Sequence, residues 1–291
     1  MKQLFTSMVS VFFCTALMAQ QDTTRPKAAA DTIRIGNMII INKNGSNDNK
    51  DGNRSVHIFS KKENSGKASA ISTNWFIVDL GFANYNDKTN YANTGEYLVN
   101  RSGVPALAKS DFKLNAGKSI NVNIWVFMQR FNLIKNYVNL KYGIGVELNN
   151  YRYKSAISYL EKNPFNNNLA PAPVIIRDSV SFSKNKLAAD YITVPLMLNF
   201  RTSNSSKNKG LSLSAGVSAG YLYSQRNKQA SKERGKQTNK GDYDLQQFKF
   251  SYIGEVGLGP VLLYGSYTPT SIYQRGMNIR PYTLGIRFSN W

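Results

Sequence analysis

A long stretch near the middle of the chain, residues 136–151, alternates almost without error between apolar and polar side chains. Because successive side chains of a strand point to opposite sides, this pattern predicts one strand with an apolar face and a polar face. At about 3.3 Å per residue the segment would extend roughly 50 Å, well beyond a typical soluble strand. Its apolar positions are Val138, Leu140, Tyr142, Ile144, Val146 and Leu148.

Seven further segments alternate in the same way, at residues 75–84, 118–130, 189–201, 211–224, 247–258, 261–268 and 279–288. In one of them Pro195 predicts a local irregularity, because proline cannot donate a backbone hydrogen bond to a neighbouring strand. The connections are short at 131–135, 202–210 and 259–260, of medium length at 269–278, and long and polar at 85–117, 152–188 and 225–246. Alternating short turns and long loops are typical of outer-membrane barrels. The pattern therefore predicts an all-β fold over residues 71–291: an eight-stranded antiparallel up-and-down transmembrane β-barrel.

The chain opens with the features of a secretory signal peptide over residues 1–19. Lys2 precedes an apolar stretch that is too short to span a bilayer as a helix, and Ala19 supplies a small residue before the expected cleavage. Cys14 is the single cysteine and lies in this segment, so the exported chain would have neither disulfides nor a thiolate metal site. We therefore expect export and an outer-membrane location.

Residues 20–70 are mostly polar, and we interpret them as a flexible periplasmic N-terminal extension. Within 31–43, two apolar runs flank Gly36 and Asn37, a pair suited to a two-residue turn, which indicates a short hairpin. The hairpin could pack near the barrel base or be offered to a periplasmic protein by β-augmentation; the sequence leaves both open. A run at 47–52 mimics the start of a calcium-binding loop, but Ile58 stands where a glutamate ligand is needed, so no metal is expected.

Composition agrees with a membrane barrel. Hydrophobic residues make up 42% of the chain, yet the mean hydropathy is only −0.38, as expected of strands that are apolar at every second position. The 17 tyrosines, 15 phenylalanines and 3 tryptophans supply aromatic side chains for both membrane interfaces. The net charge of +20 would suit a nucleic-acid partner. We expect none, because the charges fall in loops and tails of an exported chain.

The polar positions of the predicted strands point into the barrel, and several of them are charged. Eight strands enclose an interior about filled by side chains, so a wide aqueous pore is not expected. Because unpaired buried charge is costly, we expect these residues to pair in a structural lumen charge network, with a proton or ion path as the alternative. The predicted members are Asp79, Lys141, Glu147, Arg201, Lys249, Glu255 and Arg287.

The third long connection is strongly basic between residues 225 and 242, with six cations against Glu233 and Asp242. Outside the cell it would face outer-membrane lipid, the anionic head groups of lipopolysaccharide, or surface glycans. It is either a solvated loop or a surface for adhesion. Other expected partners are the barrel-insertion machinery and an unidentified periplasmic or surface protein. The six cations of this surface basic loop are Arg226, Lys228, Lys232, Arg234, Lys236 and Lys240.

Four runs of sequence resemble the PorT-like outer-membrane β-barrel domain family of Bacteroidetes: YVNLKYGIGVELNNYRY at 137–153, YITVPLMLNF at 191–200, LSLSAGVSAGYLY at 211–223 and RPYTLGIRFSNW at 280–291. The most recognisable piece is the pattern of Tyr191, Pro195 and Leu196, which marks a position in the fold. The resemblance implies an eight-stranded outer-membrane barrel. One branch of that family assists protein secretion, but no motif specific to that role is visible in this chain.

Catalytic chemistry is not expected. Enzymes of this architecture generally use a histidine as general base, and the single histidine, His57, lies in the N-terminal extension. We therefore predict no catalytic residues and no cofactor, and a structural, adhesive or assembly and secretion-accessory role. One alternative is a soluble periplasmic lipocalin-like barrel, whose apolar face would point inward around a ligand. The other is an outer-membrane barrel enzyme that uses Asp87, Glu96 and Asp111.

Overall fold

The computed structural model of the protein describes residues 31–35, 38–42, 57–60, 70–100, 102–165, 172–202, 210–258 and 261–289. The chain divides into two compact units, Met1–Gly66 and Lys67–Trp291. Among the residues described, no helix is long and apolar enough to cross a membrane. The predicted signal peptide, the turn at Gly36 and Asn37 and the turn at 259–260 lie outside the described residues.

The N-terminal unit contains a three-stranded antiparallel sheet in the order β1-β2-β3. Its strands are β1 (Asp31–Ile35), β2 (Met38–Asn42) and β3 (His57–Ser60). Ile35 pairs with Met38, which is the register of a hairpin with a two-residue turn. The third strand, which includes His57, is an addition that the polar sequence around it did not predict.

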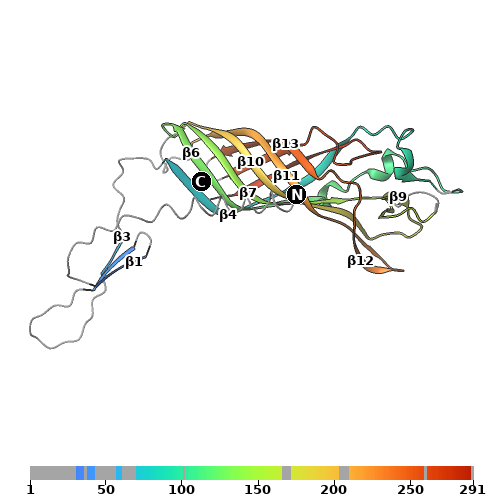
Figure 1. The fold of residues 1–291 in the computed structure, drawn as a ribbon, viewed down its shortest axis with the longest axis horizontal. Helices are drawn as coiled ribbons and strands as arrows, with labels where there is room; N and C mark the ends of the chain where they lie inside the picture. Colours follow the sequence, from blue (N-terminus) through green and yellow to red (C-terminus); the bar gives the residue numbers. More distant parts are fainter. Residues whose placement is uncertain are drawn as a thin grey trace, which may run out of the picture. The chain divides into compact units, whose positions relative to one another are not determined.

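Eight long antiparallel strands of the second unit close into a ring, in which each strand pairs with the next and the last pairs with the first. Figure 1 shows them wound around one axis. The strands are β4 (Ile71–Asp87), β6 (Ile120–Ile134), β7 (Val138–Arg152), β10 (Lys184–Arg201), β11 (Ser212–Ser231), β13 (Phe248–Leu258), β14 (Val261–Tyr267) and β15 (Ile279–Phe288). The predicted eight-stranded antiparallel barrel is confirmed.

The barrel is apolar outside and polar inside. On β10, the side chains of Ile192, Val194 and Leu196 point outward and are between 43% and 49% exposed, while Thr193 between them is 1% exposed. The same alternation holds around the ring, so an apolar belt faces outward, and its exposure is stable only in contact with lipid. A lipocalin-like barrel would have the opposite arrangement, and the structure contradicts that alternative.

Local irregularities in the strands follow from particular residues. Neither Val194 nor Pro195 has a ladder partner on β7, which confirms the irregularity predicted from the proline. Lys135 and Asn136 both have positive φ, and Tyr137 donates its N–H to the Ile134 carbonyl, so β6 and β7 are joined by a tight turn whose twist suits a hairpin. The strands therefore begin and end within a few residues of their predicted bounds on this side.

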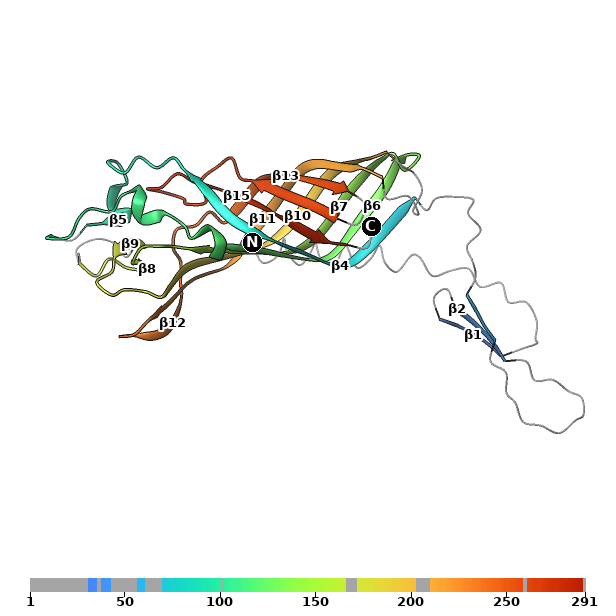
Figure 2. The same ribbon diagram turned by 180° about the vertical axis from the view of Figure 1, so that it is seen from behind.

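The described parts of the long connections lie at one end of the barrel, where they form what we call the cap: residues 88–100, 102–119, 153–165, 172–183, 241–247 and 268–278. Figures 1 and 2 show its elements gathered at the same end. It contains a sheet in the order β5-β9-β8 and three short 3-10 helices. Their bounds are β5 (Leu98–Val99), β8 (Ile157–Leu160), β9 (Val174–Arg177), η2 (Gly95–Tyr97), η3 (Lys109–Phe112) and η4 (Ala116–Lys118).

The prediction of a basic loop at 225–246 is wrong in its secondary structure. β11 continues to Ser231, turns, and pairs with β12 (Gly235–Lys240) as an antiparallel hairpin beyond the barrel wall. β10 extends alongside, with Lys184 opposite Ala230. The polar composition pointed to a loop, but backbone pairing with β10 satisfies the hydrogen bonds of this polar strand. The hairpin that carries β12 projects from the barrel in Figure 1.

Candidate functional site

The charged residues predicted for the lumen form ion pairs. Arg287 Nε lies 2.6 Å from Asp79 Oδ1 and its Nη2 lies 2.8 Å from Asp79 Oδ2, while its Nη1 contacts Glu255. Glu255 also accepts a hydrogen bond from Lys141, and all four side chains are nearly inaccessible to solvent. Trp125 and Asn123 donate to Asp79 Oδ2 as well, at 2.8 and 3.1 Å. The chain thus compensates each of these buried charges with an opposite one.

A second group lies nearer the cap. Lys249 Nζ is 2.5 Å from Glu147 Oε1 and sits 4.5 Å from the centre of the Tyr191 ring. Asn149 also donates to Glu147, at 3.0 Å. Six of the seven predicted lumen residues are therefore brought into two buried clusters. Arg201, the seventh, points inward near the end of β10 and has no ion-pair partner among the residues that the structure describes.

The centre of the lumen is filled. A cavity of about 30 Å³ between the two clusters, lined in part by Glu147, Glu255 and Arg287, has room for about one water molecule. Tyr264 crosses the lumen and donates to Asn121 Oδ1 at 2.5 Å, and its ring lies against the facing glycines Gly81 and Gly285. A side chain at either glycine would collide with this ring. The arrangement fills the centre of the lumen with side chains.

The cap closes the same barrel at one mouth with a tyrosine-rich core. The hydroxyls of Tyr153, Tyr159 and Tyr273 form a chain with oxygen separations of 2.6 and 2.7 Å. Tyr97 donates to the Tyr243 carbonyl at 2.6 Å, and its ring packs against Tyr273. Burial raises the pKa of Tyr153 to about 12 and raises the pKa of Tyr159 and Tyr273 well above the usual range. The tyrosines of the cap thus build a core of their own.

Outside the barrel, the extended strands carry a row of cations on one face, which we call the cationic face. Cross-strand partners share a face, and the register pairs Lys186 with Lys228 and with Arg152, and Arg226 with Lys240. Among the described residues of these strand extensions, the only carboxylate on this face is that of Asp190, which forms an ion pair with Arg226. The face comprises Arg152, Lys184, Lys186, Arg226, Lys228, Lys236 and Lys240.

A β-bulge sets this face. Asp190 pairs with Ser224 but Tyr191 pairs with Leu222, so Tyr223 is an extra residue on β11. Before the bulge the odd-numbered residues of β11 point outward; after it, the even-numbered residues do. Without the shift, Arg226 and Lys228 would point toward the cap. With it, Asn227 and Gln229 are buried there instead, with 0% and 5% exposure.

The inner side of the hairpin is fixed to the cap by hydrogen bonds. Gln229 Nε2 donates to Ser158 Oγ at 2.8 Å, and Asn185 Nδ2 donates to the Ile157 carbonyl at 2.6 Å. At the tip, Arg234 lies 2.9 Å from Asp178. Burial opposes ionisation of Asp178, yet hydrogen bonds from Ser158, Val180 and Arg234 hold the pKa of its carboxyl below the usual value. The cationic face is therefore presented on a fixed support.

The six predicted basic residues divide into two groups. Arg226 and Arg234 pair with Asp190 and Asp178 and hold the hairpin in place. Lys228, Lys232, Lys236 and Lys240 have no acidic partner in the described part of the chain, so their ammonium groups are available to a ligand. Sequence reasoning missed Arg152, Lys184 and Lys186, which lie far from the basic run and join it only through strand pairing. Within the described ranges, no group of three or more His, Cys, Asp or Glu side chains could hold a metal ion.

A family model described as "Outer membrane protein beta-barrel domain" matches residues 76–270 of this chain, which is more than half of its length. No protein of curated function matches the sequence. Among solved structures, the chain is similar to the crystal structure of Ail, the attachment invasion locus protein of Yersinia pestis, in complex with the heparin analogue sucrose octasulfate. The sequence identity is 12%, the alignment covers 74% of this chain and 98% of that chain, and the TM-score is 0.29.

Proposed function

Because this chain belongs to the outer membrane protein beta-barrel domain family, we propose that it is a sealed, non-enzymatic barrel whose cationic face binds anionic groups at the cell surface. Its partner in this role is the phosphate-bearing head group of lipopolysaccharide in the same membrane. The barrel supplies anchorage, the cap supplies rigidity, and the lysines supply the contact. The role is structural or adhesive rather than catalytic.

The observation that carries the proposal is the position of the cationic face relative to the apolar belt. Lys186 lies six residues beyond Ile192, the outermost apolar residue of the belt on β10. Six residues correspond to roughly 20 Å along a strand and, with the tilt of barrel strands, to about 14 Å above the belt. The interfacial layer is roughly 5–8 Å thick on each side, so this is the level of the lipopolysaccharide sugars just beyond it. Several lysines on one rigid face at that level favour multivalent binding of phosphate.

Within the family, the resemblance described above further suggests a PorT-like barrel, and we include that assignment in the proposal. The pattern of Tyr191, Pro195 and Leu196 has local structural roles: Tyr191 packs against Lys249, Pro195 interrupts the β7 ladder, and Leu196 faces outward. Tyr191 lies inside the barrel and Leu196 lies in the lipid-facing belt, so the pattern gives no polar surface for a secretion partner. The solvent-exposed lysines of the cationic face favour binding of anionic groups at the cell surface over a role in assembly.

The test compares lipopolysaccharide binding of the wild type with that of a triple variant, Lys184→Gln, Lys228→Gln and Lys236→Gln. Fluorescent lipopolysaccharide is titrated onto the refolded chain in neutral detergent. Since each lysine near an anionic surface contributes about 1 kcal/mol, we expect the dissociation constant to rise about a hundredfold. Binding by the wild type should also weaken steeply with salt.

The matched control removes the same charge elsewhere in the cap, by Lys88→Gln, Lys113→Gln and Lys154→Gln, three exposed lysines outside the cationic face. A change of less than about threefold is expected, since only net charge differs. Equal loss in both triple variants would show that overall charge, not this face, attracts the ligand. Unchanged binding in the first variant would refute the proposed function.

A further inference from the structure

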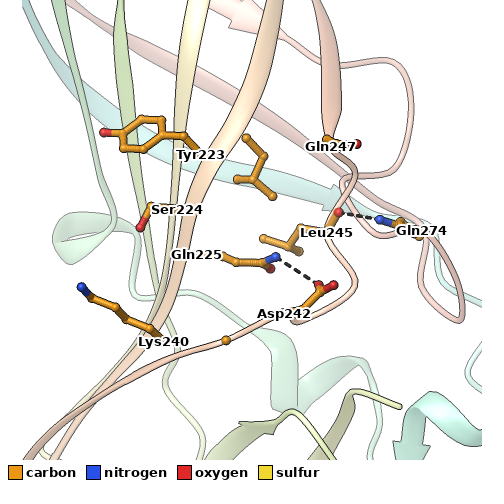
Figure 3. Close-up of a pocket in the computed structure, with 10 residues that line it drawn as sticks. Tyr223, Ser224, Gln225, Lys240, Asp242, Leu245, Gln247 and Gln274 are labelled. Carbon is orange, nitrogen blue, oxygen red and sulfur yellow. Dashed lines mark hydrogen bonds between the residues drawn. The ribbon is translucent and has the colours of Figure 1, made fainter. Parts of the chain in front are cut away.

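A recess opens in the wall where β11 changes partners. β11 pairs with β13 up to Tyr221 and with β12 from Arg226 onward, and between these points the chain runs through residues 241–247. The gap leaves a depression of about 430 Å³, shown in Figure 3. That volume lies in the lower part of the roughly 300–1,000 Å³ range of small-molecule sites. Lys240, the end of the cationic face, lines the recess.

The walls of the recess are held in place without a ligand. Gln225 is fixed at both ends of its amide: Nε2 donates to Asp242 Oδ1 at 3.1 Å, and Oε1 accepts from the Tyr243 N–H at 3.0 Å. Gln274 Nε2 donates to the Leu245 carbonyl at 2.9 Å. Figure 3 shows the bond between Gln225 and Asp242 and the bond between Gln274 and Leu245 as dashed lines. A preformed site of this kind loses little conformational entropy on binding.

Several polar atoms of the lining have no hydrogen-bond partner in the described part of the chain. They are acceptors and a cation: the amide oxygens of Gln247 and Gln274, the second carboxylate oxygen of Asp242 and the ammonium of Lys240. Leu222, which is partly buried, supplies an apolar surface beside them. Acceptors suit the hydroxyls of a sugar, the apolar surface suits its C–H face, and the ammonium suits an acidic substituent.

We infer that this recess binds one unit of an acidic saccharide. The hydroxyls donate to Gln247, Gln274 and Asp242, and the carboxylate or phosphate of the sugar is bound by Lys240. This inference deepens the proposed function and rests on it, because the same face would hold lipid phosphates with its lysines and a sugar with the recess. The saccharide is either part of lipopolysaccharide or a free polysaccharide at the cell surface.

The experiment uses the full chain and two variants that carry the same two types of substitution, one inside the recess and one outside it. Lys240→Gln with Gln247→Ala removes a cation and an acceptor from the recess. Lys236→Gln with Gln237→Ala makes the same two changes on β12 outside it. All four side chains lie on the surface or at its edge, so both variants should retain the heat-dependent gel shift of a folded barrel. Asp242→Asn is a milder third variant, which preserves the acceptor for Gln225.

Each variant is titrated with an acidic tetrasaccharide of uronic acids, with sugar-bearing lipopolysaccharide, and with phosphatidylglycerol vesicles. The recess variant should lose at least about tenfold in tetrasaccharide affinity, since a charge-assisted hydrogen bond contributes about 1.5–3 kcal/mol. The β12 control should change less than about twofold in tetrasaccharide affinity. Both variants lose one lysine of the cationic face, so their binding of phosphatidylglycerol vesicles should weaken equally, by about fivefold, whereas on lipopolysaccharide the recess variant should weaken more than the control.

The three probes distinguish the source of the saccharide, and they distinguish failure of the recess proposal from failure of the proposed function. If the recess variant loses more lipopolysaccharide affinity than the β12 control and the wild type does not bind the tetrasaccharide, the recess binds sugars of the membrane itself. Selective loss with the tetrasaccharide would assign it to free polysaccharide. If the recess variant and the β12 control lose the same affinity for every probe, the recess is not a saccharide site, whereas the proposed role of the cationic face is unaffected. Unchanged lipopolysaccharide binding in the variant with Lys184→Gln, Lys228→Gln and Lys236→Gln would overturn the proposed function.

Discussion

The lumen and the cationic face both consist of charged residues on strands, and β7 contributes to both, yet the two regions differ in how the charges are compensated. In the lumen, Lys141, Lys249 and Arg287 each contact a carboxylate, and all of them are 5% exposed or less. On the cationic face, Lys228 and Lys236 face solvent with no acidic partner among the described residues. Desolvation explains the difference: a buried cation requires an opposite charge, whereas a solvated one does not.

The position of a residue along its strand decides which of the two regimes applies. A shift of one residue moves a side chain from the outer face to the inner one. On β11 the bulge at Tyr223 makes that shift at the point where the strand leaves the barrel. The comparison therefore predicts that register, rather than the number of charges, governs both stability and binding.

The largest effect is expected from insertion of one alanine between Gln225 and Arg226, which shifts the alternation of β11 by one residue beyond the bulge. Arg226 and Lys228 would then point toward the cap, where burial of a cation without a partner costs several kcal/mol each. We expect the hairpin to detach from the cap, so that protease cleaves near residues 226–240 while the barrel retains its heat-dependent gel shift. Tyr223→Ala keeps the register and should remain resistant. Resistance of the insertion variant would show that the register of β11 does not set the face.

A smaller effect, on the lumen side of the comparison, is expected from Asp79→Ala. This change leaves Arg287 with Glu255 as its carboxylate partner and removes the acceptor of Trp125. Breaking a buried pair costs about 3–5 kcal/mol, so the midpoint of urea unfolding in detergent should fall clearly. Glu147→Gln should destabilise less, because the amide can still accept from Lys249 and Asn149.

Neither lumen variant should conduct. Tyr264 and the packed clusters fill the barrel, and loss of one carboxylate does not create a continuous path. Planar-bilayer recordings of Glu147→Gln would check this. A large steady current would mean that the charge network is a gate rather than a structural seal.

The sequence was sufficient for the barrel because alternation of apolar and polar residues acts at every position of a membrane strand. It also placed Asp79, Glu147 and Lys249 on the inner face, since their neighbours fixed the phase. It failed beyond the membrane, where both faces of β11 and β12 are polar and no alternation remains. The bulge at Tyr223, the pairing of Lys186 with Lys228 and the tyrosine core depend on long-range contacts. No local pattern encodes them.

The smallest effect is expected from high pH, and it separates the cap from the barrel. The pKa of Tyr153 is raised by burial to about 12, against about 10 in an unfolded chain. The folded cap therefore retains a proton that the unfolded one loses, so this contribution is complete below pH 10 and declines between pH 10 and 12. The decline amounts to at most about 1.4 kcal/mol per pH unit for this residue.

Limited proteolysis of cap residues 88–119 from pH 9 to 12 measures this decline, with the heat-dependent gel shift as the readout for the barrel. Cleavage should rise above pH 10 while the gel shift persists. Tyr153→Phe cannot ionise at this position, and Tyr159 keeps its bond to Tyr273, so its cleavage should rise less steeply with pH. If both proteins lose protection along the same curve, the buried hydroxyl chain does not control the cap.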